Sequence, residues 1–204
     1  RPLTATTLTT APSSKTEILV DDSNFKRPAV DSRQYRLLKL ANGLEVALVS
    51  DRDADEAGAA LSVKAGSFDD TLLGLAHFHE HMLFLGTQKY PEEDDYEKYL
   101  SSNGGACNAW TSDDTTCYYF NVNAASLEGA LDRLAQFFVA PTLEKDAVER
   151  EVKAVDSEYR MALQDDGWRL HSVLKATAKQ DHPFARFSTG SEQTLLEKAG
   201  GVDG

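Results

Sequence analysis

The feature that most constrains this chain is a pair of histidines, His77 and His81, which are four residues apart. They lie in residues 74–85, a segment that is otherwise mainly apolar and that we predict to be a helix. On a helix this spacing brings both imidazole rings to one face, about one turn apart. Zinc binds two histidine nitrogens in that arrangement, and a catalytic zinc site needs one more protein ligand. The chain must therefore fold so that another segment reaches this helix.

Glu80 completes an H-x-x-E-H pattern and lies beside the same face of the predicted helix, three residues after His77. From there its carboxylate can take a proton from a water that zinc activates, without being a ligand itself. The alternative is a surface helix that carries histidines by chance. With 5 histidines in 204 residues, chance produces this pattern in roughly one of a hundred such chains, so we favour a zinc site.

A second predicted helix, over residues 144–163, offers the missing ligand. It carries Glu151 and Glu158, which are seven residues apart and therefore lie near one face, two turns along. One carboxylate can serve as the third protein ligand of a tetrahedral site whose fourth position is left to water. The other can orient a ligand or the water from behind. The spacing alone does not say which glutamate takes which role.

The order of the predicted elements indicates an α+β fold. Residues 34–40 and 44–50 are short β-prone runs joined by Ala41-Asn42-Gly43, a hairpin signal. We expect the next strand to continue a mostly antiparallel sheet, with helices packed on one face. The further predicted strands cover residues 59–65, 107–111 and 116–122, and the predicted helices cover residues 74–85, 92–102, 126–139, 144–163 and 168–178.

The chain length suits one sizeable domain better than two. Residues 1–31 are polar and irregular, so we expect a flexible leader, and residues 32–204 are then the catalytic domain. No apolar run approaches the roughly 18 residues that a membrane-spanning helix needs. We therefore expect no membrane partner.

Charge and cysteine content narrow the partners further. The chain has 33 acidic and 21 basic residues, for a net charge of -12, whereas a protein that binds phosphate backbones needs the opposite sign. We expect no nucleic-acid partner, and the acidity is most simply explained by a solvated surface. Cys107 and Cys117 lie on neighbouring predicted strands, so a bridge is conceivable. Reduced thiols and a cytoplasmic location are favoured, with an organelle as the alternative.

Several stretches beyond the histidine motif carry a resemblance to a known family. The motif itself is HFHEHMLFLGT at residues 77–87, followed by KYP at residues 89–91. In these stretches the chain resembles the insulysin (insulin-degrading enzyme) and pitrilysin family of inverted-motif zinc metallopeptidases. The resemblance covers about residues 35–194 and includes NAWTS at 108–112, LEGALDR at 127–133, REVKAVDSE at 150–158, WRL at 168–170 and HPF at 182–184.

The resemblance implies a role for each matching residue of the metal site. His77 and His81 match the family's histidine ligands and Glu158 matches its glutamate ligand, for one Zn²⁺ per chain. Glu80 matches the general base. Glu151 matches the glutamate that supports the site from behind the ligands, so Glu80 and Glu151 are the implied catalytic carboxylates.

The resemblance also implies a peptide-binding surface. Asn108, Ala109 and Trp110 match the edge strand along which family members hold an extended peptide by backbone hydrogen bonds. Phe84 and Trp168 either line the cleft or are core aromatic residues.

Two positions depart from the family pattern. His79 stands where a cysteine is usual, and on a helix it points away from the His77–His81 face, so we do not assign it as a ligand. His171 stands where an aromatic residue is expected, which would alter the shape of the pocket.

The implied activity is that of a zinc-dependent endopeptidase that hydrolyses small peptides. Family members are clamshells of four related domains, roughly a thousand residues in all. We expect this chain to be the first domain, to stop short of that domain's end, and to need the remaining domains or a partner subunit for efficient turnover. The alternative is a truncated, zinc-holding peptide-binding domain without turnover. A metal-storage site is disfavoured, because three ligands beside a base suit an open site.

Overall fold

The structure is a computed structural model that describes residues 15–197. The chain divides into two compact units, Arg1–Ala54 and Asp55–Gly204. The first part of the predicted leader, residues 1–14, lies outside the described residues. Between residues 15 and 197, no helix combines the length and apolar character that crossing a membrane requires.

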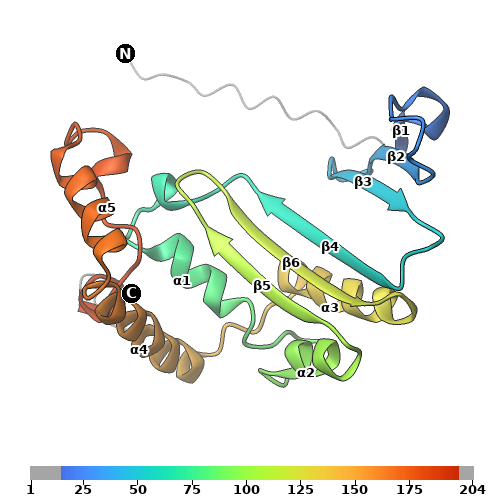
Figure 1. Ribbon diagram of the computed structural model, residues 1–204. Coiled ribbons are helices and arrows are strands. Elements are labelled where there is room, and N and C mark those ends of the chain that lie inside the picture. The colour runs from blue at the N-terminus through green and yellow to red at the C-terminus, as the bar shows by residue number, and fades with distance from the viewer. Residues whose placement is uncertain (1–14, 198–204) are drawn as a thin grey trace, which may run out of the picture. The chain divides into compact units, whose positions relative to one another are not determined.

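The first unit holds a three-stranded antiparallel sheet in the order β1–β2–β3 (Figure 1). The predicted hairpin is confirmed, because β2 (Gln34–Lys39) pairs with β3 (Glu45–Ser50) along its whole length. At the turn, Gly43 has a φ of 91°. Glycine adopts this conformation without strain, whereas residues with a Cβ do not. The side chain of Asn42 accepts a hydrogen bond from the Leu44 N–H and so closes the turn.

The segment after residue 14 differs from the irregular leader that we expected. Glu17–Val20 forms β1, which pairs with β2, and a short 3₁₀ turn, η1 (Asp22–Asn24), follows it. The Asp22 carboxylate accepts a hydrogen bond from the Tyr35 N–H at 2.8 Å and so ties this turn to β2. In a run of four residues, hydrophobic periodicity cannot distinguish a strand from coil. Glu17–Val20 becomes a strand because it pairs with the free edge of β2.

The second unit is built on another antiparallel sheet, in the order β4–β6–β5. Its strands are β4 (Glu56–Val63), β5 (Ala106–Thr111) and β6 (Thr116–Asn123). Our expectation that the third strand continues the first sheet is wrong, because β4 pairs with β6 from Glu56↔Asn123 to Val63↔Thr116. Alternation along β4 predicts a buried and an exposed face but carries no information about the neighbouring strand.

Helices cover one face of this second sheet, which confirms the α+β fold (Figure 1). They are α1 (Leu75–Met82), α2 (Asp95–Ser102) and α3 (Leu127–Val139), all within a few residues of the predicted ranges. Alternate side chains of β6 are buried beneath them, whereas Tyr119 on the other face is exposed. The core contains Leu83, Tyr96, Leu100, Tyr118, Phe120, Val122, Ala130, Leu134 and Phe137.

Two further helices complete the unit, α4 (Lys145–Ala162) and α5 (Asp166–Thr177). Val152 and Val155 of α4 are fully buried in a second apolar cluster that also contains Leu195 and Phe78. Since Phe78 belongs to α1, this cluster packs α4 against the helix that carries the histidines. The remaining elements are short: η2 (Ser67–Asp69), η3 (Ala124–Ser126), η4 (Pro183–Ala185) and the π-helical turn η5 (Gln193–Glu197).

Candidate metal centre

The helix that carries the histidines begins at a tightly fixed point. The two carboxylate oxygens of Asp70 accept hydrogen bonds from the Gly74 N–H at 2.9 Å and the Ala76 N–H at 2.8 Å. Burial raises the pKa of Asp70 above its ordinary value. Gly74 has a φ of 89°, and a Cβ there would lie 2.2 Å from the Cα of Gly190. Glycine is therefore required where α1 starts against the segment after η4.

Three side-chain atoms from α1 and α4 converge on one point. The Nε2 atoms of His77 and His81 are 3.3 Å apart, and the Glu158 Oε2 atom lies 3.7 Å from the first and 3.6 Å from the second. All three residues stood in the predicted ligand set. Ligand atoms of a tetrahedral zinc with bonds of about 2.0–2.1 Å are separated by about 3.3 Å, so this triangle is close to the size that zinc requires.

The outer nitrogens of both rings are held by acceptors. The Nδ1 atom of His77 lies 2.7 Å from the Thr189 carbonyl oxygen, and the Nδ1 atom of His81 lies 2.7 Å from Glu151 Oε1. A carbonyl and a carboxylate only accept hydrogen bonds, so each Nδ1 carries a proton, and a ring in its neutral form then turns its Nε2 lone pair inward. Two lone pairs and a carboxylate oxygen then face one another. A bound cation would satisfy all three.

The two glutamates of α4 lie in different places around the histidines. Glu158 contributes an oxygen to the three-atom cluster, whereas Glu151 contacts His81 from behind. Burial opposes a charged His81 ring, but the hydrogen bond to Glu151 and the nearby carboxylates of Glu158 and Glu80 outweigh it. The pKa of His81 is therefore raised.

Glu80 is buried beside this cluster, with a relative exposure of 8%. Its Oε2 atom accepts a hydrogen bond from the Thr111 hydroxyl at 2.5 Å. Thr111 is the last residue of β5. Neither Thr111 nor Thr189 was predicted from the sequence to support the site. Alternation along β5 puts Thr111 on the same face as Ala109. This alternation is the one sequence feature that could have placed Thr111 near the site.

Two cavities adjoin the cluster and contain the residues predicted to bind substrate. The larger, about 680 Å³, is lined by His77 and Glu80 together with Ala109, Trp110 and Trp168. The smaller, about 480 Å³, also reaches His77 and Glu80, and its further lining includes His81, Phe84, Asn108, Ala109, Glu151 and Glu158. β5 passes both cavities and, among the described strands, pairs with β6 alone.

Phe84 fits both roles considered for it. Its ring lies 5.1 Å from the ring of Phe137 and 6.2 Å from that of Tyr96, within the core cluster, and it also lines the smaller cavity. Trp168, by contrast, is half-exposed on α5.

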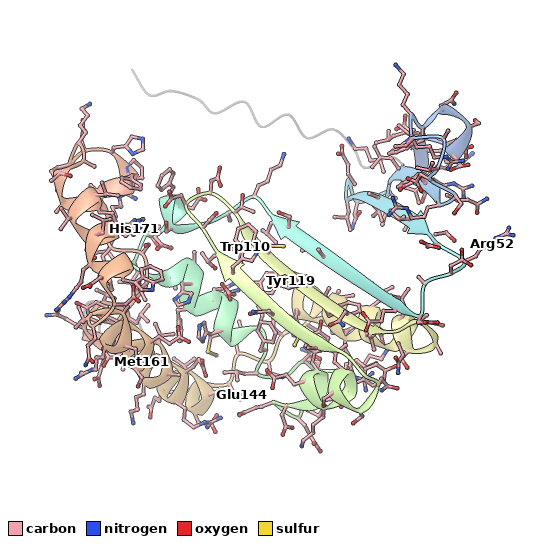
Figure 2. The ribbon with its side chains drawn as sticks, viewed as in Figure 1. Arg52, Trp110, Tyr119, Glu144, Met161 and His171 are labelled. Atoms are coloured by element: carbon pink, nitrogen blue, oxygen red, sulfur yellow. The ribbon has the colours of Figure 1, made fainter. Side chains whose placement is uncertain are left out.

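The two unusual histidines lie apart from the three-atom cluster. His79 is not part of the three-atom cluster, and burial lowers the pKa of its ring. His171 lines the larger cavity, and its ring meets those of Trp168 and Phe184 edge-on at 6.1 and 5.9 Å. Figure 2 shows His171 on α5 and Trp110 on β5.

The two cysteines are free thiols on adjacent strands. Cys107 lies opposite Phe120 and Cys117 lies opposite Trp110, so the pairing register does not place the thiols across from each other. Burial raises the pKa of Cys107 to about 11.

Residues 45–187 match the model of the insulinase family, peptidase family M16. The chain belongs to this family. Insulin-degrading enzyme-like 1, peroxisomal, from Arabidopsis thaliana is 48% identical over 193 residues, which cover 93% of this chain and 20% of that protein. Insulin-degrading enzyme from Mus musculus is 50% identical over 178 residues, which cover 86% of this chain and 17% of that protein.

A solved member of the insulinase family confirms the fold. The crystal structure of pitrilysin superposes with a TM-score of 0.81 at 41% sequence identity, over 86% of this chain and 19% of that one. The resemblance inferred from the motifs is thereby confirmed. The chain spans about a fifth of the length of the insulinase relatives it matches.

Proposed function

We propose that this chain carries the catalytic site of a zinc-dependent endopeptidase that hydrolyses small peptides. The observation that supports it most is the convergence of His77 Nε2, His81 Nε2 and Glu158 Oε2 beside the buried Glu80 carboxylate. Lone pairs and a carboxylate oxygen at these separations suit one Zn²⁺ held by three protein ligands, with a position left open. Membership of a peptidase family supports peptide hydrolysis as the reaction.

The chain's own residues would divide the chemistry as follows. When bound, zinc would polarise the scissile carbonyl and acidify the attacking water. Glu80 would accept the proton from that water and deliver it to the leaving amine. Thr111 would aim the Glu80 carboxylate, while Glu151 and the Thr189 carbonyl would hold the histidine rings in the tautomer that ligation needs.

The substrate would lie along β5 as an added strand. The outer edge of β5 passes both cavities, and backbone hydrogen bonds at such an edge bind extended peptides with little demand on sequence. Asn108, Ala109 and Trp110 of this strand would contact the peptide, and Phe84 and Trp168 would contact its side chains from the cavities.

A second candidate function is a zinc-holding, peptide-binding domain that needs further domains or a partner subunit for turnover. One observation favours it: the chain spans about a fifth of the length of its relatives. Groups that close over a substrate and exclude water can come from elsewhere in a longer protein.

The deciding experiment is cleavage of an internally quenched peptide by the purified chain, with and without a chelator, together with metal analysis. Chelator-sensitive cleavage that zinc restores would support the enzyme. One zinc per chain without cleavage would support the second candidate. A chain that neither binds zinc nor cleaves the peptide would contradict both candidate functions.

The same assay tests the role of Glu80. Glu80→Gln should keep one zinc per chain and lose hydrolysis by at least about 100-fold, because a neutral amide cannot accept the proton. Glu149→Gln, an exposed glutamate of α4 away from both cavities, is the matched control. Substantial hydrolysis by the Glu80 variant would refute the assigned role.

A further inference from the structure

Lys175 of α5 is almost completely buried, with a relative exposure of 8%. Its ammonium group donates hydrogen bonds to the carbonyl oxygens of Phe184 and Arg186, each at 3.2 Å, and lies 4.9 Å from the centroid of the Phe184 ring. Among residues 15–197, no carboxylate forms an ion pair with this ammonium. The buried charge is therefore balanced by backbone carbonyls and the face of a ring.

This arrangement is better explained by the bonds that Lys175 makes than by its packing. A buried ammonium without a carboxylate is unfavourable, and a methionine of similar length would fill the same space without that cost. Both carbonyl acceptors belong to one short segment, residues 183–189, which starts at η4. The Arg186 guanidinium adds a longer hydrogen bond, 3.4 Å, to the Phe68 carbonyl.

The same segment carries the carbonyl that holds His77. The Thr189 oxygen lies 2.7 Å from His77 Nδ1, and Thr189 follows Arg186 by three residues. Between residues 187 and 190, no backbone group forms a backbone–backbone hydrogen bond with another residue that the structure describes. The position of the Thr189 carbonyl therefore depends on the contacts that hold the chain on either side of it.

Those contacts come from three directions. Beyond Thr189, Gly190 packs so closely on the start of α1 that a Cβ on Gly74 would lie 2.2 Å from its Cα. Before it, the Phe187 ring packs edge-on against Tyr159 of α4, with the centroids 5.1 Å apart. Lys175 adds two direct hydrogen bonds to the backbone, which fix direction as well as distance.

We infer that Lys175 is a positioning residue of the metal centre: it fixes the Thr189 carbonyl, which keeps the proton of His77 on Nδ1. This inference rests on the proposed function, since the tautomer matters for a histidine that binds metal through Nε2. His81 provides a comparison within the same molecule, because its Nδ1 is held by Glu151 of α4. Loss of Lys175 should affect His77 and spare His81.

The tautomers of the two rings test the inference without metal or turnover. Long-range ¹H–¹⁵N NMR spectra of the zinc-free chain, at a pH where both rings are neutral, distinguish Nδ1–H from Nε2–H. Both rings of the wild type should carry the proton on Nδ1. In Lys175→Met, His77 should become a mixture of both tautomers and His81 should stay unchanged. Lys153→Met, at an exposed lysine of α4, is the matched control and should leave both rings as in the wild type.

Zinc affinity is the second readout. Removing a group that supports a metal-binding histidine lowers affinity by about 10–100-fold. Lys175 acts one step further out, so we expect the lower end, about tenfold, for Lys175→Met in competition with a chromophoric chelator. Lys175→Arg keeps a cation and N–H donors, and it should recover most of the affinity and the Nδ1–H state of His77.

A purely structural role would give a different result. It would lower the melting temperature of Lys175→Met but would not separate His77 from His81. If the methionine variant does not fold, Lys175→Gln replaces it, because this shorter neutral side chain keeps donors but not the charge or the reach of lysine. The expected shift at His77 is the same.

The outcomes separate this inference from the proposed function. Unchanged His77 in a folded variant, or equal shifts in both histidines, would overturn the inference, and chelator-sensitive cleavage by the wild type would still support the peptidase. A shift confined to His77, in a chain that cleaves no peptide, would support the inference and contradict an active enzyme. A wild-type chain with the His77 proton on Nε2 would overturn the inference directly.

Discussion

At the scale of single residues, the candidate site depends on groups that do not touch the proposed metal. Glu151 and the Thr189 carbonyl hold the Nδ1 protons of His81 and His77, which leaves the Nε2 lone pairs directed at Glu158 Oε2. Without these acceptors the rings could rotate or take the other tautomer. The arrangement prepares the ligand atoms before a metal binds.

Replacing Glu151 measures the value of that support. Glu151→Gln keeps an oxygen acceptor for His81 Nδ1 but removes its negative charge, which makes the ring a weaker ligand. We expect zinc affinity to fall by about 10–100-fold, measured by competition with a chromophoric chelator. Glu149→Gln should match the wild type. Equal affinity for the Glu151 variant would mean that the hydrogen bond alone, and not the charge, supports the histidine.

Thr111 offers a second test, this time on the base. Thr111→Val removes the hydroxyl that donates to the buried Glu80 carboxylate. Loss of a hydrogen bond to a buried charge misdirects the proton acceptor, so we expect kcat to fall by roughly tenfold with zinc content unchanged. Thr111→Ser keeps the donor and should recover most of the rate. Failure of serine to do so would show that the methyl group, and not the hydroxyl, matters.

At the scale of elements, the short helix α1 is held in place at both ends. At the start of α1, the Asp70 carboxylate accepts two backbone hydrogen bonds. The segment that follows α1 is tied to α3, because the Asp132 carboxylate of α3 accepts hydrogen bonds from Lys89 Nζ and the Tyr90 hydroxyl. The Arg133 guanidinium also lies over the Tyr90 ring, 4.2 Å from its centroid. A helix of two turns gains its stability from such neighbours more than from its own propensity.

The contact at Asp132 predicts a pH dependence of stability. The hydrogen bonds from Lys89 and Tyr90 lower the pKa of Asp132 below its ordinary value. A lowered folded-state pKa contributes stability that is present above the unfolded value of about 3.9 and is lost as the pH falls through the folded value. Asp132→Asn should therefore lower the melting temperature slightly at pH 7, and the gap to wild type should close in acid. A gap that stays constant with pH would contradict this account.

At the scale of the whole molecule, the proposed ligands join elements that are far apart in the chain. His77 and His81 belong to α1 and Glu158 belongs to α4. A metal that binds all three ligands therefore stabilises the packing of α1 against α4, which the cluster around Val152 and Val155 also holds. If the proposed site holds a metal, its binding and the stability of the second unit are thermodynamically linked.

Removing the metal tests this linkage. Free zinc at 100 times its Kd should add about 2.7 kcal/mol to the free energy of unfolding, seen as a rise in melting temperature that a chelator reverses. Glu158→Ala should abolish most of the zinc-dependent rise. A melting temperature of the wild-type chain that does not respond to zinc or chelator would contradict a site formed by these three residues.

The sequence by itself determined the features that depend on local periodicity and composition. The helix with His77, Glu80 and His81, the helix with both glutamates, and the hairpin at Gly43 all follow from spacing of roughly 3.6 or 2 residues and from turn chemistry. The motifs also identified the family correctly.

Only the tertiary structure decided the features that depend on distant contacts. It pairs β4 with β6 instead of β3 and adds Glu17–Val20 to the first sheet. It puts Glu158 in the three-atom cluster and Glu151 behind His81, a division that the family motif implied but the helix spacing left open. It also brings Thr111 to Glu80 and the Thr189 carbonyl to His77. A strand's pattern does not specify its neighbour, and two glutamates on one helix face have the same local signal. Their differences arise from packing between segments up to 112 residues apart.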